Sequence, residues 1–95
     1  MATIEELDLT IPPAIRAGLD RYQLGIPTGD CLRAILSGDL YAAFARADPD
    51  TTAAMPAIVG YIVRHLPTAS YGDPKRVAVW LARHAAELAA GRAAR

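Results

Sequence analysis

The sequence predicts a small all-α protein, a compact single-domain bundle of about five short helices. Apolar residues recur every three or four positions over most of the chain, which is the period of one helical face. Several prolines stand where helices are expected to begin, and proline fits the first helical turn because its missing N–H costs nothing there. A chain of 95 residues is also too short for a second domain, so residues 1–95 are treated as one.

Residues 1–11 are expected to form an extended N-terminal arm. Leu7, Leu9 and Ile11 alternate with polar residues, and a period of two indicates a strand-like segment. Pro12-Pro13 then ends the arm and begins the first helix, which continues to a stop at Gly25.

The other four helices are expected where a capping residue precedes an apolar face. They are predicted over about 29–36, 40–47, 50–66 and 74–90, with a flexible tail at 91–95. Pro56 predicts a kink or a delayed start in the helix over 50–66. The candidate N-caps are Thr28, Asp39, Asp48 and Asp73.

Composition excludes several classes of protein. Hydrophobic residues make up 53% of the chain, too many for intrinsic disorder. Ten basic residues balance ten acidic ones, so no net charge draws the chain to nucleic acid or to an anionic membrane. The single cysteine, Cys31, excludes a disulfide framework. Since neither a signal peptide nor a long apolar run is present, the chain is expected in the cytoplasm.

The two halves of the chain carry opposite charge. Residues 1–50 have four basic and eight acidic residues, a net charge of −4, whereas residues 51–95 have six basic and two acidic ones, a net charge of +4. Together with a free N-terminal arm, this asymmetry favours a homo-oligomer, with a dimer as the expected form.

Catalytic and metal-binding constellations are not found, so we predict a protein that is not an enzyme and carries no cofactor or metal. Cys31 lies on the apolar stripe of its helix, which is typical of a core cysteine. His84 shares a face with Trp80 and is expected to be partly buried, while His65 is expected to cap a carbonyl. The two histidines do not have the spacing of metal ligands on one helix.

The aromatic residues are expected in the core, since aromatic side chains at helical spacing usually pack there. The pair of short helices around Ser37-Gly38 resembles a helix-turn-helix in outline. Its second helix is too acidic for a surface that follows phosphates, so nucleic-acid binding is not favoured. The aromatic residues meant here are Tyr22, Tyr41, Tyr61 and Trp80.

One charge cluster opposes local preference and is the candidate ligand site. Lys75 and Arg76 stand in the first turn of the last helix, where the helix dipole disfavours cations. Free amides, cations and an aromatic ring would suit a phosphorylated, nucleotide-like ligand. The plainer interpretation is a solvated charge run, with Asp73 neutralising part of it and Arg76 reaching a carboxylate of the acidic half. The candidate ligand-binding residues are Arg64, His65, Ser70, Tyr71, Lys75 and Arg76.

The motifs of the chain resemble a group of small phage- and prophage-encoded proteins of unknown function. The matching pattern is IPPxxxxGLxRY, then IPxG, LxAxLxxDL and AxxRAD, carried here by residues 11–22, 26–29, 32–40 and 43–48. Tyr71-Gly72-Asp73-Pro74 and Val79-Trp80-Leu81 fit the same pattern. Lys75 departs from it, because the group tends to be acidic at that position.

The resemblance implies a phage accessory protein acting in the host cytoplasm, where small proteins often counter host defence. The leading hypothesis is a non-enzymatic counter-defence protein that binds and sequesters a small phosphorylated immune signal. The alternative is an inhibitor or adaptor that binds a host defence protein through acidic residues of the N-terminal half. Those acidic residues are Asp20, Asp30, Asp39, Asp48 and Asp50.

Overall fold

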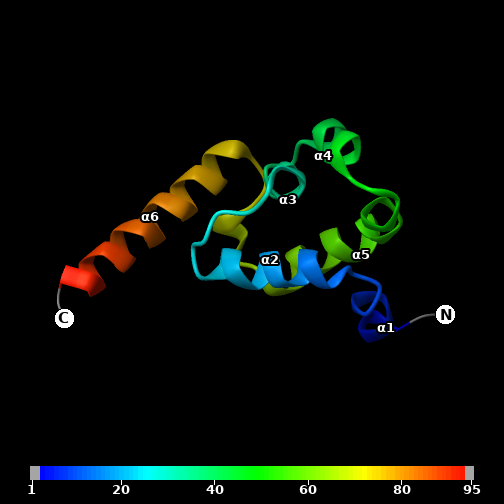
Figure 1. The fold of residues 1–95 in the computed structure, drawn as a ribbon, viewed down its shortest axis with the longest axis horizontal. Coiled ribbons are helices and arrows are strands. Elements are labelled where there is room, and N and C mark those ends of the chain that lie inside the picture. The colour runs from blue at the N-terminus through cyan, green and yellow to red at the C-terminus, as the bar shows by residue number, and fades with distance from the viewer. Residues whose placement is uncertain (1–2, 94–95) are drawn as a thin grey trace.

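The protein is all-α, as predicted, in a computed structural model that describes residues 3–93, with side chains through Glu87. The part described contains six α-helices, one short 3₁₀ turn and no strand. In Figure 1, α2 and α5 cross the lower part of the view, α3 and α4 lie above them, and α6 projects to one side. The elements are α1 (Ile4–Asp8), α2 (Pro13–Gln23), α3 (Asp30–Leu36), α4 (Leu40–Arg46), α5 (Pro49–His65), η1 (Thr68–Ser70) and α6 (Pro74–Ala93).

Residues 4–8 form a helix and residues 9–11 a turn, so the prediction of an extended arm over residues 1–11 is wrong for this part of it, while residues 1–2 lie outside the described residues. A capping box starts α1: the Thr3 hydroxyl accepts from the Glu6 backbone N–H at 3.1 Å, and the Glu6 carboxylate accepts from the Thr3 N–H at 3.2 Å. These local hydrogen bonds outweigh the period-two pattern, whose Leu7 and Leu9 are exposed. The absence of a strand edge in α1 also removes one argument for self-association.

Helix starts follow the predicted caps with one exception. Asp39, Asp48 and Asp73 each accept a hydrogen bond from the backbone N–H three residues on. Thr28 is not a cap, because α3 begins after Gly29 and the Thr28 hydroxyl donates to the Gly29 carbonyl at 3.4 Å instead.

The last helix is longer than expected and gives the molecule its elongated shape. α6 continues through Gly91 to Ala93, and the rest of the predicted tail, residues 94–95, lies outside the described residues. Because α6 projects from the other helices (Figure 1), the principal extents are 49 × 26 × 21 Å. Among the described residues, no helix has the length and hydropathy needed to cross a bilayer.

The core lies where α2, α3, α5 and the start of α6 meet. Its fully buried side chains include Leu19 and Tyr22 from α2, Ile58 from α5 and Val77 from α6. Burying one such side chain contributes about 1.5–3 kcal/mol. Trp80 is partly buried against this cluster, less than the sequence suggested.

Two glycines allow backbone segments to approach closely. Gly25 has φ +85°, and an added Cβ there would lie 2.0 Å from the Cβ of His84. Gly38 has φ +75°, and its added Cβ would lie 2.6 Å from the carbonyl oxygen of Gly72. The Gly72 N–H donates to the Leu36 carbonyl at 2.8 Å. The first contact fixes α6 against the end of α2, and the second fixes the segment before α6 against α3.

Candidate functional site

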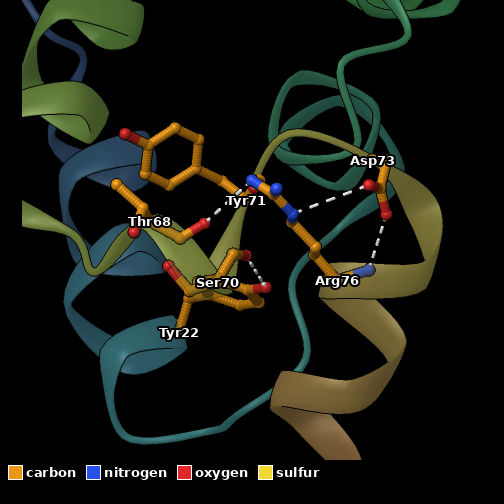
Figure 2. A network of polar contacts seen from close by, with 6 residues as sticks. All are labelled: Tyr22, Thr68, Ser70, Tyr71, Asp73 and Arg76. Carbon is orange, nitrogen blue, oxygen red and sulfur yellow. Dashed lines mark hydrogen bonds and ion pairs between the residues drawn. The ribbon is translucent and has the colours of Figure 1, made fainter.

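The segment from Thr68 to Arg76, which we call the α6 corner, is held by its own hydrogen bonds (Figure 2). Ser70 is completely buried, and its hydroxyl donates to the Pro67 carbonyl at 2.6 Å. Its own carbonyl accepts from the hydroxyl of Tyr22 at 2.6 Å. Ser70 therefore joins η1 to α2 and offers no donor to a ligand. Burial raises the pKa of Tyr22 to about 12, while the charge of Arg33 opposes that shift.

The side chain of Arg76 also binds within the corner. Its Nη1 donates to the carbonyls of Thr68 and Tyr71 at 3.3 and 3.4 Å, and its Nε lies 3.7 Å from the Asp73 carboxylate. Asp73 also accepts from the backbone N–H of Arg76 at 2.7 Å. A carboxylate thus occupies the helix end where an anion was expected. Of the interpretation as a solvated charge run, the neutralisation by Asp73 is observed, whereas Arg76 binds the carbonyls of Thr68 and Tyr71 in place of a carboxylate of the acidic half.

Tyr71 and Lys75 differ in their availability. The Tyr71 ring is partly buried against the main core and points away from the Arg76 guanidinium in Figure 2. Lys75 is exposed and forms no hydrogen bond or ion pair with the described side chains. It lines a shallow hollow with Thr68 and Arg76. Lys75 is thus the freely available cation of this corner.

Arg64 and His65 are engaged elsewhere. Arg64 forms an ion pair and hydrogen bond with Asp8, which attaches α1 to the end of α5. The exposed His65 stacks on Tyr61, with ring centroids 4.5 Å apart. The guanidinium of Arg16 also lies 4.5 Å from the Tyr61 ring centroid. Neither Arg64 nor His65 lines the hollow beside Lys75. The six predicted ligand residues therefore do not form one site.

Cys31 and His84 have structural surroundings. Cys31 is partly buried and its thiol donates to the Ala43 carbonyl at 3.6 Å, while burial, followed by the charge of Asp48, raises its pKa. His84 is half-buried, with Nδ1 3.0 Å from the Trp80 carbonyl oxygen, as expected for a core histidine. Within the described residues, no three His, Cys, Asp or Glu side chains are grouped to hold a metal ion.

Several large apolar side chains of α4 and α5 are exposed, and the sequence analysis did not predict this exposure. Tyr41, expected in the core, is 87% exposed, and Leu40 beside it is 61% exposed. Leu40 shares a shallow hollow with Val59 of α5, so these two exposed residues connect the two helices. We call this set the α4–α5 surface; it comprises Leu40, Tyr41, Phe44, Val59 and Val63.

The sequence held a signal for this surface. Ala43 fills the contact of α4 with Ala34 of α3 and Met55 of α5. Because helices of seven residues such as α3 and α4 have only about two turns, one small residue suffices to fill the contact. A short helix with an alanine at its packing position and larger apolar residues beside it leaves those larger residues outside.

Carboxylates flank this apolar surface. Asp39 caps α4 and Asp48 caps α5, and residues 39–50 carry three Asp against one Arg, a net charge of −2. Neither cap forms an ion pair with a described side chain. Hydrogen bonds from Thr51 hold the pKa of Asp48 below its usual range. Asp48 is therefore charged at neutral pH, and both Asp39 and Asp48 are exposed beside the apolar residues.

Comparison of the chain with protein-family models, with curated proteins and with solved structures found no match. The resemblance to small phage-encoded proteins therefore stays a prediction from sequence motifs. The function of the chain is accordingly inferred from the geometry of its described residues.

Proposed function

We propose that the protein acts by binding another protein, as an inhibitor or adaptor without catalytic chemistry of its own. The observation that carries the proposal is the α4–α5 surface, because exposed Tyr41 and Leu40 contribute nothing to the core of their own chain. Large exposed apolar patches commonly mark interaction sites, and aromatic residues are enriched there. The resemblance to phage-encoded proteins directs the proposal to a host defence protein in the host cytoplasm.

The charge beside the surface suggests the chemistry of the partner. Asp39 and Asp48 flank α4 without ion-pair partners among the described side chains. Complementary charge steers association and favours partners of opposite sign. The partner segment is therefore an amphipathic one, with apolar anchors for Leu40 and Tyr41 and with Lys or Arg beside them.

A titration with synthetic amphipathic helices tests this proposal. A Leu/Lys peptide should bind and shift the amide NMR signals of α4 and the second half of α5, whereas its Leu/Glu analogue should not. Tyr41→Ser should weaken the Leu/Lys peptide about tenfold or more, because an exposed anchor is lost. Val79→Ser is the matched control, since Val79 is 50% exposed on α6.

Three results would contradict the proposal. Equal binding of the acidic and basic peptides would remove the charge argument. Equal weakening by Tyr41→Ser and Val79→Ser would show that the α4–α5 surface is not the site. Self-association of the free protein through Tyr41, seen by sedimentation at the same concentration, would show that a second copy occupies the surface.

Sequestration of a phosphorylated signal is the second candidate, and one observation favours it. Lys75 and Arg76 line the same shallow hollow, together with Thr68. Thermal-shift measurements with nucleotides and cyclic dinucleotides test it, because a ligand at a hundred times its Kd stabilises by about 2.7 kcal/mol. A stabilisation that Lys75→Glu abolishes would favour this candidate, and no shift with any nucleotide would remove it.

A further inference from the structure

A groove of about 610 Å³ separates the α1–α2 connection from the first half of α5. Leu7, Leu9 and Pro12 line it on one side, and Ala53 and Pro56 line it on the other. Leu9 is 84% exposed although it lies between two helices. The groove therefore offers apolar contacts that no described part of the chain fills.

The wall made by the α1–α2 connection presents no free backbone donor. Pro12 and Pro13 have no N–H. The N–H groups of Leu9, Thr10 and Ile11 already donate to carbonyls of α1 residues, at 3.0–3.2 Å. The Thr10 hydroxyl also donates, to the Leu7 carbonyl at 2.6 Å. A ligand that needs donors, such as a phosphate or a carboxylate, finds none on this wall.

The opposite wall adds a carboxylate. Asp50, in the first turn of α5, is the charged side chain among the lining residues, and it forms no ion pair with the described side chains. The groove is thus mainly apolar, with one acidic side chain in its lining.

We propose that this groove binds a short basic and apolar peptide segment. An apolar side chain would lie between Leu9 and Pro56, and a neighbouring Lys or Arg would reach the Asp50 carboxylate. Charge complementarity selects this class, because the lining carries a carboxylate and no cation. The inference is independent of the α4–α5 surface, because none of the residues of that surface lines the groove.

The probe for this site is the tetrapeptide amide N-acetyl-Leu-Lys-Leu-Lys, with N-acetyl-Leu-Glu-Leu-Glu as its acidic counterpart. Titration followed by amide NMR should shift the signals of Leu9, Thr10 and Ala53 with the basic peptide only. Asp50→Asn should weaken this binding at least fivefold. Asp30→Asn is the matched control, since Asp30 occupies the first turn of α3 and does not line the groove.

A second variant keeps the test valid if Asp50→Asn perturbs α5. Leu9→Ser changes an exposed side chain and should also weaken the basic peptide at least fivefold, while Tyr41→Ser should leave its binding unchanged. Tyr41→Ser thereby separates failure of this site from failure of the α4–α5 surface. Equal binding of both tetrapeptides, or wild-type binding by both Asp50→Asn and Leu9→Ser, would overturn the proposal.

Discussion

The α6 corner and the α4–α5 surface both reverse what the sequence suggests about their residues. In the corner, Arg76 and Ser70 donate to nearby carbonyls, so polar groups that suggested a ligand site stabilise the fold. On the α4–α5 surface, Tyr41 was predicted to lie in the core but is exposed instead, together with Leu40. The difference teaches that in so small a domain a residue's type does not decide its role. Its role depends on whether its position faces a neighbouring helix or segment.

The largest expected effect is at the glycine that lets the corner dock on α3. Gly38→Ala should lower the free energy of unfolding by about 2–4 kcal/mol, because it adds left-handed strain and a contact 2.6 Å from the Gly72 carbonyl oxygen. Gly29→Ala is the control: its Cβ would meet nothing within 4 Å, and its stability should stay within about 1 kcal/mol of wild type. Urea melts measure both, and equal stability of the two variants would show that the corner is not docked as described.

The next effect concerns the aromatic residue that joins α6 to α2. The indole Nε1 of Trp80 donates to the Tyr22 carbonyl at 2.8 Å, and its ring lies 4.2 Å from that of His84. Trp80→Ala should cost about 2–4 kcal/mol, below the usual range for a fully buried Trp because Trp80 is only partly buried. Trp80→Phe should recover most of this loss. A loss below about 1 kcal/mol for the alanine variant in chemical unfolding would place Trp80 on the surface.

A smaller and pH-dependent effect is expected at Tyr22. Tyr22→Phe should cost about 1–3 kcal/mol, because the buried Ser70 carbonyl loses its donor. Burial raises the folded pKa of Tyr22 to about 12, above the ordinary value of 10.0, so its contribution is present below pH 10 and is lost as pH rises towards 12.

Unfolding measured across this range should therefore show a steeper alkaline loss for wild type than for Tyr22→Phe. Tyr41→Phe is the control, because its hydroxyl makes no hydrogen bond with the described residues and its ring is exposed. Parallel alkaline curves for wild type and Tyr22→Phe would contradict the buried hydrogen bond.

The fold was largely predictable because its signals are local. Asp39, Asp48 and Asp73 act as caps on their own segments, and the apolar face of α5 follows one helical period. The first helix was missed because the capping box between Thr3 and Glu6 competed with an alternating pattern of side chains.

The candidate site was less predictable because it depends on contacts between distant segments. The ion pair between Arg64 and Asp8 joins residues 56 positions apart, and Tyr22 binds Ser70 across 48 positions. Neither pairing leaves a trace in the spacing of the residues. The exposure of Tyr41 likewise depends on how Ala43 packs between α3 and α5.

The most direct test of the structural role of the α6 corner is a comparison of Arg76→Glu with Lys75→Glu by urea melts without ligand. Arg76→Glu removes the donor to Thr68 and Tyr71 and places a carboxylate near Asp73, so it should lower the free energy of unfolding by about 1 kcal/mol or more. Lys75→Glu removes no described contact and puts an acid at a helix start, so its stability should be unchanged or slightly higher. If Arg76→Glu were instead as stable as wild type or more stable, Arg76 would be free for a ligand, and the account of the corner as a structural element would be wrong.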